Sequence, residues 1–264
     1  IEQRLDRLHR LSKKYGGSLD AMLVLQDSLR AQLAQLDTAE TRLQDLATAV
    51  EDAARRVGEL AGRLSRKRID AAKKLTTQVT KELSALRMER TRFAVEVLPL
   101  PGETSYGQMG HDAVEFVFSA NPGEPLKPLA KVASGGELSR VMLALKTILA
   151  ESDRVPVLIF DEVDAGVGGA VAEVMGTRLR DLSRHHQVLC VTHLPQVGSQ
   201  AHAHYLVEKQ VRQQRTVTQV RLLTEREREE EVARMLAGVT VTNSARAAAA
   251  EMIGSAKERR ARSD

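Results

Sequence analysis

Aromatic residues are scarce in this chain of 264 residues: tryptophan is absent, and aromatic side chains make up only 3%. Sites that bind single-stranded nucleic acid stack bases on aromatic rings, so the composition disfavours specific single-strand recognition. The single cysteine, Cys190, excludes an internal disulfide and a cysteine-rich metal site, and it is typical of a reducing compartment. Its apolar neighbours predict a buried thiol.

Long hydrophobic runs are missing as well. No stretch of about 18 apolar residues occurs, and no secretory signal leads the chain, so we expect no membrane partner and a cytoplasmic location. The first residue is an isoleucine inside a helical pattern, which suggests a piece of a longer protein. The net charge of +4 permits a nucleic-acid partner without demanding one.

Proline is absent from residues 1–98, which permits a long helix. Gly16 and Gly17 break a first helical pattern, and Ser18 is a candidate N-cap for the next one. Apolar residues then recur every seven positions: Met22, Leu29, Leu36, Leu43, Val50, Val57 and Leu64. Such a repeat is typical of a coiled coil, and about 1.5 Å per residue over residues 18–90 predicts an arm of roughly 110 Å. An ordinary helix of a bundle is the alternative.

The lower part of this predicted arm is basic. From Arg63 to Arg92, ten lysines and arginines stand against three acids. A cluster of this kind can neutralise the phosphates of double-stranded DNA without reading its sequence. The candidates for DNA contacts are Arg66, Lys67, Arg68, Lys73, Lys74 and Lys81. A solvated helix face accounts for the same charges and stays open as an alternative.

Beyond residue 92, strand and helix patterns alternate, which predicts an α/β lobe with a mostly parallel sheet and flanking helices. The chain therefore divides into a coiled-coil arm, residues 1–92, and a lobe, residues 93–264. Residues 157–160 are apolar and predict a fully buried strand. A second apolar strand, residues 187–192, follows a helical pattern, so the two strands should be parallel and end at one sheet edge.

Polar side chains follow both strands. Asp161 and Glu162 come directly after the first strand, where one acid can hold Mg²⁺ and the next can polarise an attacking water. His193 follows the second strand and would lie beside them, in a position to sense a phosphate. Acids that cap a strand end and a structural histidine are the plainer interpretation.

Two glycines stand at the start of an amphipathic helix pattern. Ser134 and Glu137 form a Ser-x-x-Glu capping box around Gly135 and Gly136. A cap needs no glycine, and each glycine costs about 1 kcal/mol of helix propensity relative to alanine. Glycines at this position let a polyphosphate approach the N–H groups of the helix end, which favours phosphate binding over a plain cap.

Taken in order, these motifs resemble the head of an ABC-type ATPase: a signature motif at Ser134, a Walker B strand before Asp161 and Glu162, a D-loop at Asp164 and a switch histidine at His193. The spacings, 27 residues from the serine to the first acid and 31 from the second acid to the histidine, make the set far more specific than any single motif. Joined to a long coiled coil, it is similar to the SMC-like branch. The segments KVASGGELSRVMLALK, LIFDEVDAGVGG and QVLCVTHLPQV are similar to bacterial DNA-repair members of that branch.

The resemblance implies ATP and Mg²⁺ as cofactors. Asp161 would bind Mg²⁺ through water, Glu162 would orient the attacking water, and His193 would contact the γ-phosphate. Asp164 would line the seam between two heads. The signature residues would contact nucleotide held mainly by a second head: Ser134, Gly135, Gly136 and Glu137.

One part of the family's pattern is missing. No Gly-Lys dipeptide occurs, so the phosphate loop Gly-x4-Gly-Lys-[Ser/Thr] is absent. The resemblance places that loop in an amino-terminal half, so we expect this chain to be the carboxy-terminal half and to be inactive alone. The implied partners are the amino-terminal half with its ascending arm, a second copy of the protein and double-stranded DNA bound without sequence preference.

The implied function is ATP-driven engagement of two heads that binds or tethers nucleoid DNA in double-strand-break repair and recombination. The alternative is a non-catalytic module that dimerises through its arm and keeps vestigial head motifs. The presence of both Glu162 and His193 argues against a relic, which needs neither residue. A transporter ATPase shares the head motifs, but the long heptad arm argues against that class.

Overall fold

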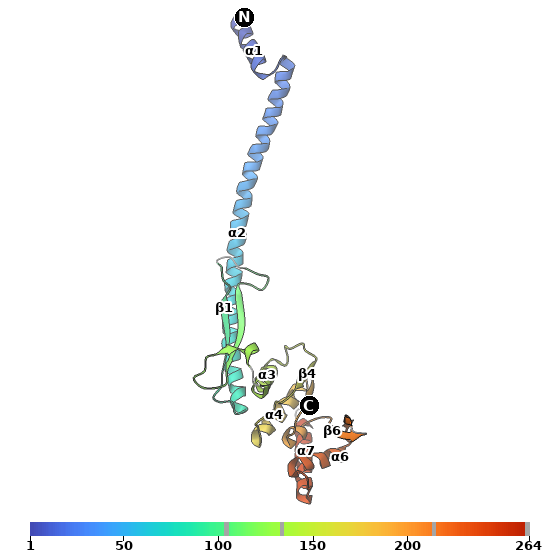
Figure 1. The fold of residues 1–264 in the computed structure, drawn as a ribbon. Coiled ribbons are helices and arrows are strands. Elements are labelled where there is room, and N and C mark those ends of the chain that lie inside the picture. Colours follow the sequence, from blue (N-terminus) through green and yellow to red (C-terminus); the bar gives the residue numbers. More distant parts are fainter. Residues whose placement is uncertain (103–105, 133–134, 213–214, 262–264) are drawn as a thin grey trace. The chain divides into compact units, whose positions relative to one another are not determined.

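The structure is a computed structural model that describes residues 1–261 apart from residues 103–105, 133–134 and 213–214. It is mixed α/β (Figure 1). The helices are α1 (Glu2–Tyr15), α2 (Leu19–Ala85), α3 (Gly135–Leu149), α4 (Ala170–Leu182), α5 (Pro195–Gly198), α6 (Glu225–Ala237), α7 (Asn243–Ala261) and the 3-10 helix η1 (Leu129–Lys131). The strands are β1 (Arg92–Pro99), β2 (Asp112–Ser119), β3 (Lys127–Pro128), β4 (Val157–Phe160), β5 (Gln187–Cys190), β6 (Tyr205–Arg212) and β7 (Arg215–Leu222).

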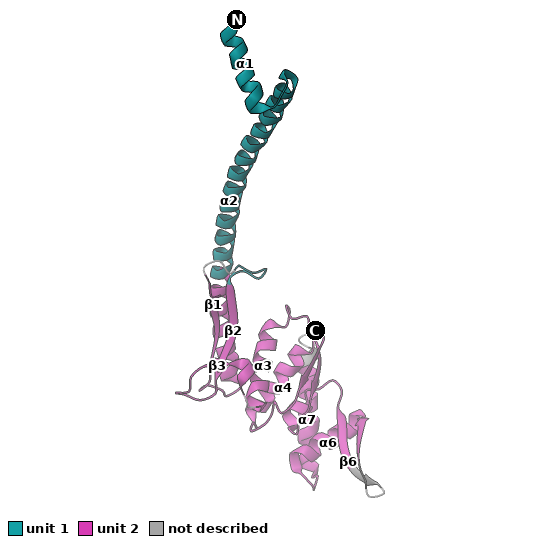
Figure 2. Ribbon diagram, turned by 45° about the horizontal axis from the view of Figure 1, so that its top comes forward, with its two compact units in different colours: residues 1–66, 103–111 teal, residues 67–102, 112–264 magenta. Residues whose placement is uncertain are grey.

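Two compact units make up the chain (Figure 2). The first comprises Ile1–Arg66 and Glu103–His111, and the second comprises Lys67–Gly102 and Asp112–Asp264. The helix α2 runs from the first unit into the second without a break, as its sequence predicts. No described helix is both long and apolar enough to cross a membrane.

In the first unit, α1 and α2 meet at the predicted glycine pair. Gly16 and Gly17 have φ of 100° and 69°, a conformation that side chains with a Cβ rarely adopt. The Ser18 hydroxyl accepts a hydrogen bond from the Ala21 N–H at 3.2 Å, which fits its predicted role as N-cap. Met22 is half-buried, and the other heptad positions of α2 in this unit are exposed to solvent: Leu29, Leu36, Leu43, Val50, Val57 and Leu64. An apolar stripe of this length is typical of a helix that pairs with another helix.

In the second unit, the lower end of α2 packs on an antiparallel sheet in the order β1-β2-β3. Phe93 of β1 lies opposite Phe118 of β2, and both rings are buried against Val79 and Leu83 of α2. The helix ends at Ala85, and Arg87 has the left-handed φ of 54° that turns the chain toward β1. This apolar cluster therefore fixes the base of the arm helix on the sheet.

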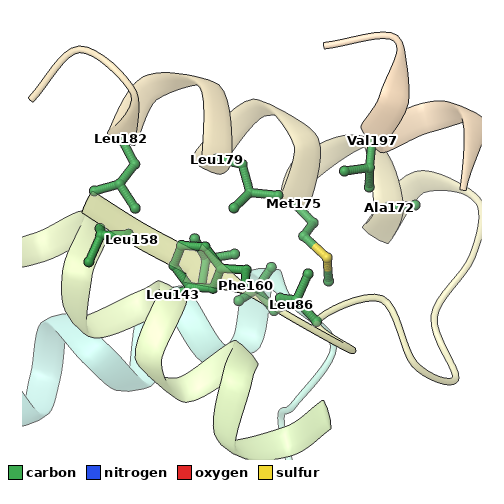
Figure 3. Close-up of a cluster of buried hydrophobic side chains, with 10 residues drawn as sticks. Leu86, Leu143, Leu158, Phe160, Ala172, Met175, Leu179, Leu182 and Val197 are labelled. Atoms are coloured by element: carbon green, nitrogen blue, oxygen red, sulfur yellow. The ribbon is translucent and has the colours of Figure 1, made fainter. Parts of the chain in front are cut away.

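The core next to the candidate site lies between α3, α4 and β4 (Figure 3). Met175, Leu179 and Leu182 point from α4 toward Phe160 on β4 and Leu143 on α3. The parallel pairing of β4 with β5, joined through α4, is the arrangement that the sequence predicts. The other described strands pair antiparallel.

The expectation that β4 is fully buried is wrong. Its side chains alternate, and Ile159 is 73% exposed while Phe160 is 5% exposed. On β5, Leu189 and the following Val191 are exposed as well. The reason is that α4 covers one face of this two-stranded sheet, and nothing in the described parts of the chain covers the other. We refer to the exposed residues Val157, Ile159, Leu189 and Val191 as the open face.

The carboxy-terminal part consists of the β6–β7 hairpin and the helix pair α6–α7. Thr224 and Glu227 form a reciprocal capping box at the start of α6. Val232 of α6 packs against Ala249 and Ile253 of α7 in a small separate core.

Candidate active site

The ends of β4 and β5 bring the predicted acids and histidine to one sheet edge. Phe160 is paired with Cys190, and the Val191 N–H continues the ladder by donating to the Phe160 carbonyl at 3.0 Å. Asp161 and Glu162 come directly after β4, and His193 comes three residues after the end of β5. Both carboxylates are exposed, so a ligand can reach them.

The Glu162 carboxylate lies over the first residue of α3. A Cβ added to Gly135 would meet Oε2 of Glu162 at 2.7 Å, which is closer than real Cβ contacts. Glu162 also has a left-handed φ of 55°, which is uncommon for a residue with a side chain. The positive end of the helix dipole favours a carboxylate at this position. The absence of a side chain at Gly135 therefore leaves the space that the Glu162 carboxylate occupies.

The second glycine allows a close approach of the backbone. A Cβ on Gly136 would lie 3.0 Å from Cβ of Ala165 and 3.2 Å from the carbonyl oxygen of Glu162. The first turn of α3 thus packs directly on the loop that follows β4. Ser134, predicted to begin the signature motif, lies outside the described residues. Glu137, the last residue of that motif, is half-buried in the first turn of α3.

Two polar residues that the sequence pattern did not point to hold this contact together. The Ser139 hydroxyl donates to the carbonyl oxygen of Asp161 at 2.9 Å, and Nη1 of Arg140 donates to that of Ala165 at 2.9 Å. Burial lowers the pKa of the Arg140 guanidinium, and the nearby Glu137 carboxylate partly offsets this. Their position one turn after the glycines was the only sequence signal for them.

Asp164 is buried, at 3% exposed, and is bonded within its own chain. Its Oδ2 accepts hydrogen bonds from the Thr192 hydroxyl at 2.6 Å and from the His193 N–H at 3.0 Å. Nδ1 of the His193 ring lies 3.2 Å from the same oxygen. The His193 side chain itself is 72% exposed.

The carboxylates at this edge suit a magnesium ion for which water and phosphate oxygens supply most of the ligands. The described residues contain no group of three or more histidine, cysteine, aspartate or glutamate side chains able to hold a metal by themselves. Mg²⁺ is commonly bound through one or two carboxylates plus substrate phosphates, so Asp161 fits the role predicted for it.

Cys190 does not contribute a nucleophile. It is half-buried on β5, and burial, together with the nearby Asp164 and Asp161, raises the pKa of its thiol to about 12. The thiol therefore stays protonated at neutral pH.

The basic residues on α2 divide into two groups. Lys67, Lys74 and Lys81 are exposed and follow one another at seven-residue intervals, on the side of the helix opposite the buried Val79 and Leu83. The other exposed candidates are Lys73 in the same unit and Arg66 in the first unit. Arg68 instead donates to the Asp112 carboxylate at 3.1 Å.

Curated relatives match nearly all of this chain. It is 41% identical over 254 residues to the DNA repair protein RecN of Halalkalibacterium halodurans, 42% identical over 267 residues to RecN of Treponema pallidum and 37% identical over 270 residues to RecN of Bacillus subtilis. These matches cover 96–98% of this chain but only 45–47% of each relative. The chain therefore spans less than half the length of the curated relatives. No protein-family model matches it.

Among solved structures, the Smc head domain with a coiled coil and joint from Pyrococcus yayanosii aligns with 88% of this chain and 41% of that chain. The TM-score is 0.56 at 15% sequence identity. A likeness at this identity shows the fold, which confirms the predicted α/β head lobe preceded by a long coiled-coil helix.

Proposed function

We propose that this chain, which is similar to slightly less than half the length of each RecN DNA repair protein, is the carboxy-terminal half of an SMC-like ATPase. In the proposed function, ATP brings two heads together, and the protein binds or tethers DNA at double-strand breaks. The chain matches only 45–47% of the length of these relatives. The remaining part of the protein is long enough to contain the missing phosphate loop. The proposal therefore concerns the assembled protein.

The observation that carries the proposal is the meeting of three segments at one sheet edge. The Glu162 carboxylate lies over Gly135, and the Ser139 hydroxyl donates a hydrogen bond to the Asp161 carbonyl oxygen. The His193 N–H donates a hydrogen bond to the Asp164 carboxylate in the loop that follows β4. Acids, a histidine and a glycine-rich helix end together form the set of groups that phosphoryl transfer needs for positioning and charge stabilisation.

The proposed roles follow from the chemistry of each group. Asp161 holds Mg²⁺ through water, Glu162 orients the attacking water, and the exposed His193 ring contacts the terminal phosphate. When bound, Mg²⁺-ATP supplies the anhydride that is cleaved and the charge that balances its phosphates. The signature residues close on nucleotide held by a second head: Ser134, Gly135, Gly136 and Glu137.

The position of Glu162 supports the assignment of the signature glycines. Its carboxylate already lies at the start of α3, where N–H groups and the helix dipole favour an anion. Phosphate oxygens of a nucleotide carry the same sign of charge and would find the same donors there.

The open face supports the proposed partner half. Four apolar side chains of β4 and the β5 strand end are exposed, and a parallel sheet is normally covered on both faces. The missing half, which would carry the phosphate loop, is the proposed cover. The exposed heptad stripe of α2 would likewise pair with an ascending helix of that half.

The basic side of α2 supports DNA as the other partner. Lys67, Lys74 and Lys81 present one positive charge every seven residues, about 10 Å apart along the helix. A row of this kind attracts a phosphate backbone without reading base sequence, as the proposed tethering of breaks requires.

The exposed heptad stripe also favours a second candidate, a non-catalytic module that dimerises through its arm. Hydrolysis separates the two candidates. The chain is assayed alone, then with the separately produced remaining half of the same protein, with Glu162→Gln as the test variant and the exposed Glu151→Gln as the control. We expect no turnover alone, turnover on mixing, a loss of about a hundredfold or more in Glu162→Gln and none in the control.

Two outcomes would overturn the proposal. Turnover by the chain alone that equals the mixture would mean a self-contained site. Halves that associate, shown by co-elution, yet hydrolyse no ATP would favour the dimerisation module.

A further inference from the structure

Asp164 makes contacts that a residue reserved for a second head would not make. Its side chain is only 4% exposed, so it presents little surface to another molecule. A carboxylate is costly to bury unless donors surround it. Here one oxygen, Oδ2, faces a hydroxyl, a backbone N–H and a ring nitrogen, all from Thr192 and His193.

Asp164 contacts both the backbone and the ring of the histidine. The His193 N–H bond holds the start of the residue, and the contact at Nδ1, 3.2 Å away, holds one edge of the imidazole. The Thr192 hydroxyl, bonded to the same oxygen, accepts from the Leu194 N–H at 3.0 Å. The segment from residue 192 to residue 194 is therefore tied to the loop that follows β4 through a single carboxylate.

The chemistry of this contact sets the tautomer of the ring. A carboxylate only accepts hydrogen bonds and repels a lone pair, so the ring nitrogen that lies 3.2 Å from Oδ2 is favoured to carry the proton. The nitrogen left for a ligand is then Nε2. In metal and catalytic sites, a partner on one ring nitrogen commonly decides which nitrogen serves the ligand in this way.

We propose that Asp164 is a positioning residue that acts in its own chain, by holding His193 with Nδ1–H toward the carboxylate and Nε2 toward the terminal phosphate. The proposal rests on the proposed ATPase function only for the identity of the ligand. The contact between Asp164 and the ring is a property of the protein without nucleotide, so it can be tested separately.

The first test is the nitrogen NMR spectrum of the histidine rings in the assembled protein without nucleotide, at a pH where the rings are neutral. His193→Gln identifies the signal by its loss, since the ring is largely exposed and its removal leaves the core intact. We expect His193 to carry its proton on Nδ1. A proton on Nε2 in the unaltered protein would overturn the proposal.

Variants of the carboxylate sharpen this result. Asp164→Ala removes the acceptor, so the ring should revert to the Nε2–H form that a histidine free in water favours. Asp164→Asn keeps an acceptor oxygen and should keep Nδ1–H. Thr192→Val removes the hydroxyl bond but not the ring contact, so its tautomer should stay that of the unaltered protein. A tautomer that is the same in all of them, Asp164→Ala included, contradicts the proposed contact.

The second test asks whether Asp164 acts through the histidine. In the assembled protein, Asp164→Ala should lower turnover on the order of ten- to a hundredfold, by analogy with the residues that orient metal-binding histidines. The half-exposed Asp181→Asn on α4 is the control and should have no effect. Combining Asp164→Ala with His193→Gln should be no worse than His193→Gln alone, because the residues act as one unit.

A further loss in the double variant would show another route, such as contact with a second head, and would overturn the proposal. If His193→Gln keeps full turnover, the proposed role of the histidine in hydrolysis fails. The tautomer then still decides whether Asp164 positions the ring, so the two failures are distinguishable.

Discussion

Arg178 on α4 donates two hydrogen bonds to the Glu82 carboxylate on α2, from Nε to Oε2 at 2.9 Å and from Nη2 to Oε1 at 3.1 Å. This two-point pairing of guanidinium and carboxylate is the strong and direction-specific form of the ion pair. It ties the base of the arm helix to the helix that follows the loop of Asp161 and Glu162. Within the second unit, the arm and the candidate site therefore share a polar connection in addition to the apolar core.

The first prediction concerns this pair. A double-mutant cycle with Glu82→Gln and Arg178→Met should give a coupling of about 1 kcal/mol in chemical unfolding, because both side chains are largely shielded. The control is the exposed pair Asp6 and Arg10 on α1, for which we expect a few tenths of a kcal/mol at most. Equal couplings for the two pairs would mean that the shielded geometry adds nothing.

The second prediction concerns Gly135. In Gly135→Ala the new Cβ would meet Oε2 of Glu162 at 2.7 Å, so the flexible carboxylate must move. We expect the assembled protein to lose turnover by about tenfold or more while its unfolding free energy changes by less than about 1 kcal/mol. Gly254→Ala on α7, where nothing lies within 4 Å of the new Cβ, should keep full activity and gain roughly 0.5–1 kcal/mol. Full activity in Gly135→Ala would contradict a need for that carboxylate position.

The third prediction concerns the open face. Ile159→Asp places a charge at a position where the native side chain is 73% exposed. The chain by itself should therefore keep its helix content and its melting temperature. Association with the remaining half should weaken by at least about tenfold, since the charge would be buried there without a partner. Leu143→Ala, in the core beneath α4, should do the reverse and cost about 2–5 kcal/mol in the chain itself. Unchanged association of Ile159→Asp in a binding titration would exclude this face as the docking surface.

The fourth prediction concerns the lysine row on α2. Charge reversal of Lys67, Lys74 and Lys81 to glutamate should weaken binding to double-stranded DNA and reduce the slope of log K against log salt by about three. The same reversal at the exposed Lys127, Lys131 and Arg154 changes the net charge equally and serves as the control. An equal loss in both variants would assign the effect to net charge rather than to the row.

The fifth prediction concerns acid stability. Burial, with the nearby Arg228, lowers the pKa of His204 below 6.5, and Glu231 partly opposes this. The unfolded chain then binds the proton more readily, so the stabilisation present above pH 6.5 is lost as the pH falls through the lowered value. The melting temperature should decline in that window in the unaltered chain and less steeply in His204→Gln. The acids with lowered pKa, Glu225 and Glu227, lose their contribution only below about 4.5, so the two effects separate.

Local rules accounted for most of the elements. The glycine pair after α1 and the seven-residue repeat of α2 each depend on neighbours within a few positions, and both predicted features are present. The β4-α4-β5 unit followed from the connection rule for parallel strands. Local patterns are sufficient there because helix and strand periodicity is a property of the chain itself.

Burial was where local reasoning failed. The apolar run of β4 predicted a fully buried strand, but the run does not record which part of the protein covers its second face. In the described residues nothing covers Ile159, and no pattern within four residues can contain that information.

The sequence by itself determined the order of helices and strands and the identity of the acids, glycines and histidine at the candidate site, since those depend on residue type and spacing. Only the tertiary structure decided how they meet. It placed Glu162 over Gly135, bonded Ser139 and Arg140 to the loop after β4, and buried Asp164 against His193. These contacts join residues more than twenty positions apart, and such pairs are fixed by the packing of α3 and α4 on the sheet rather than by any local preference.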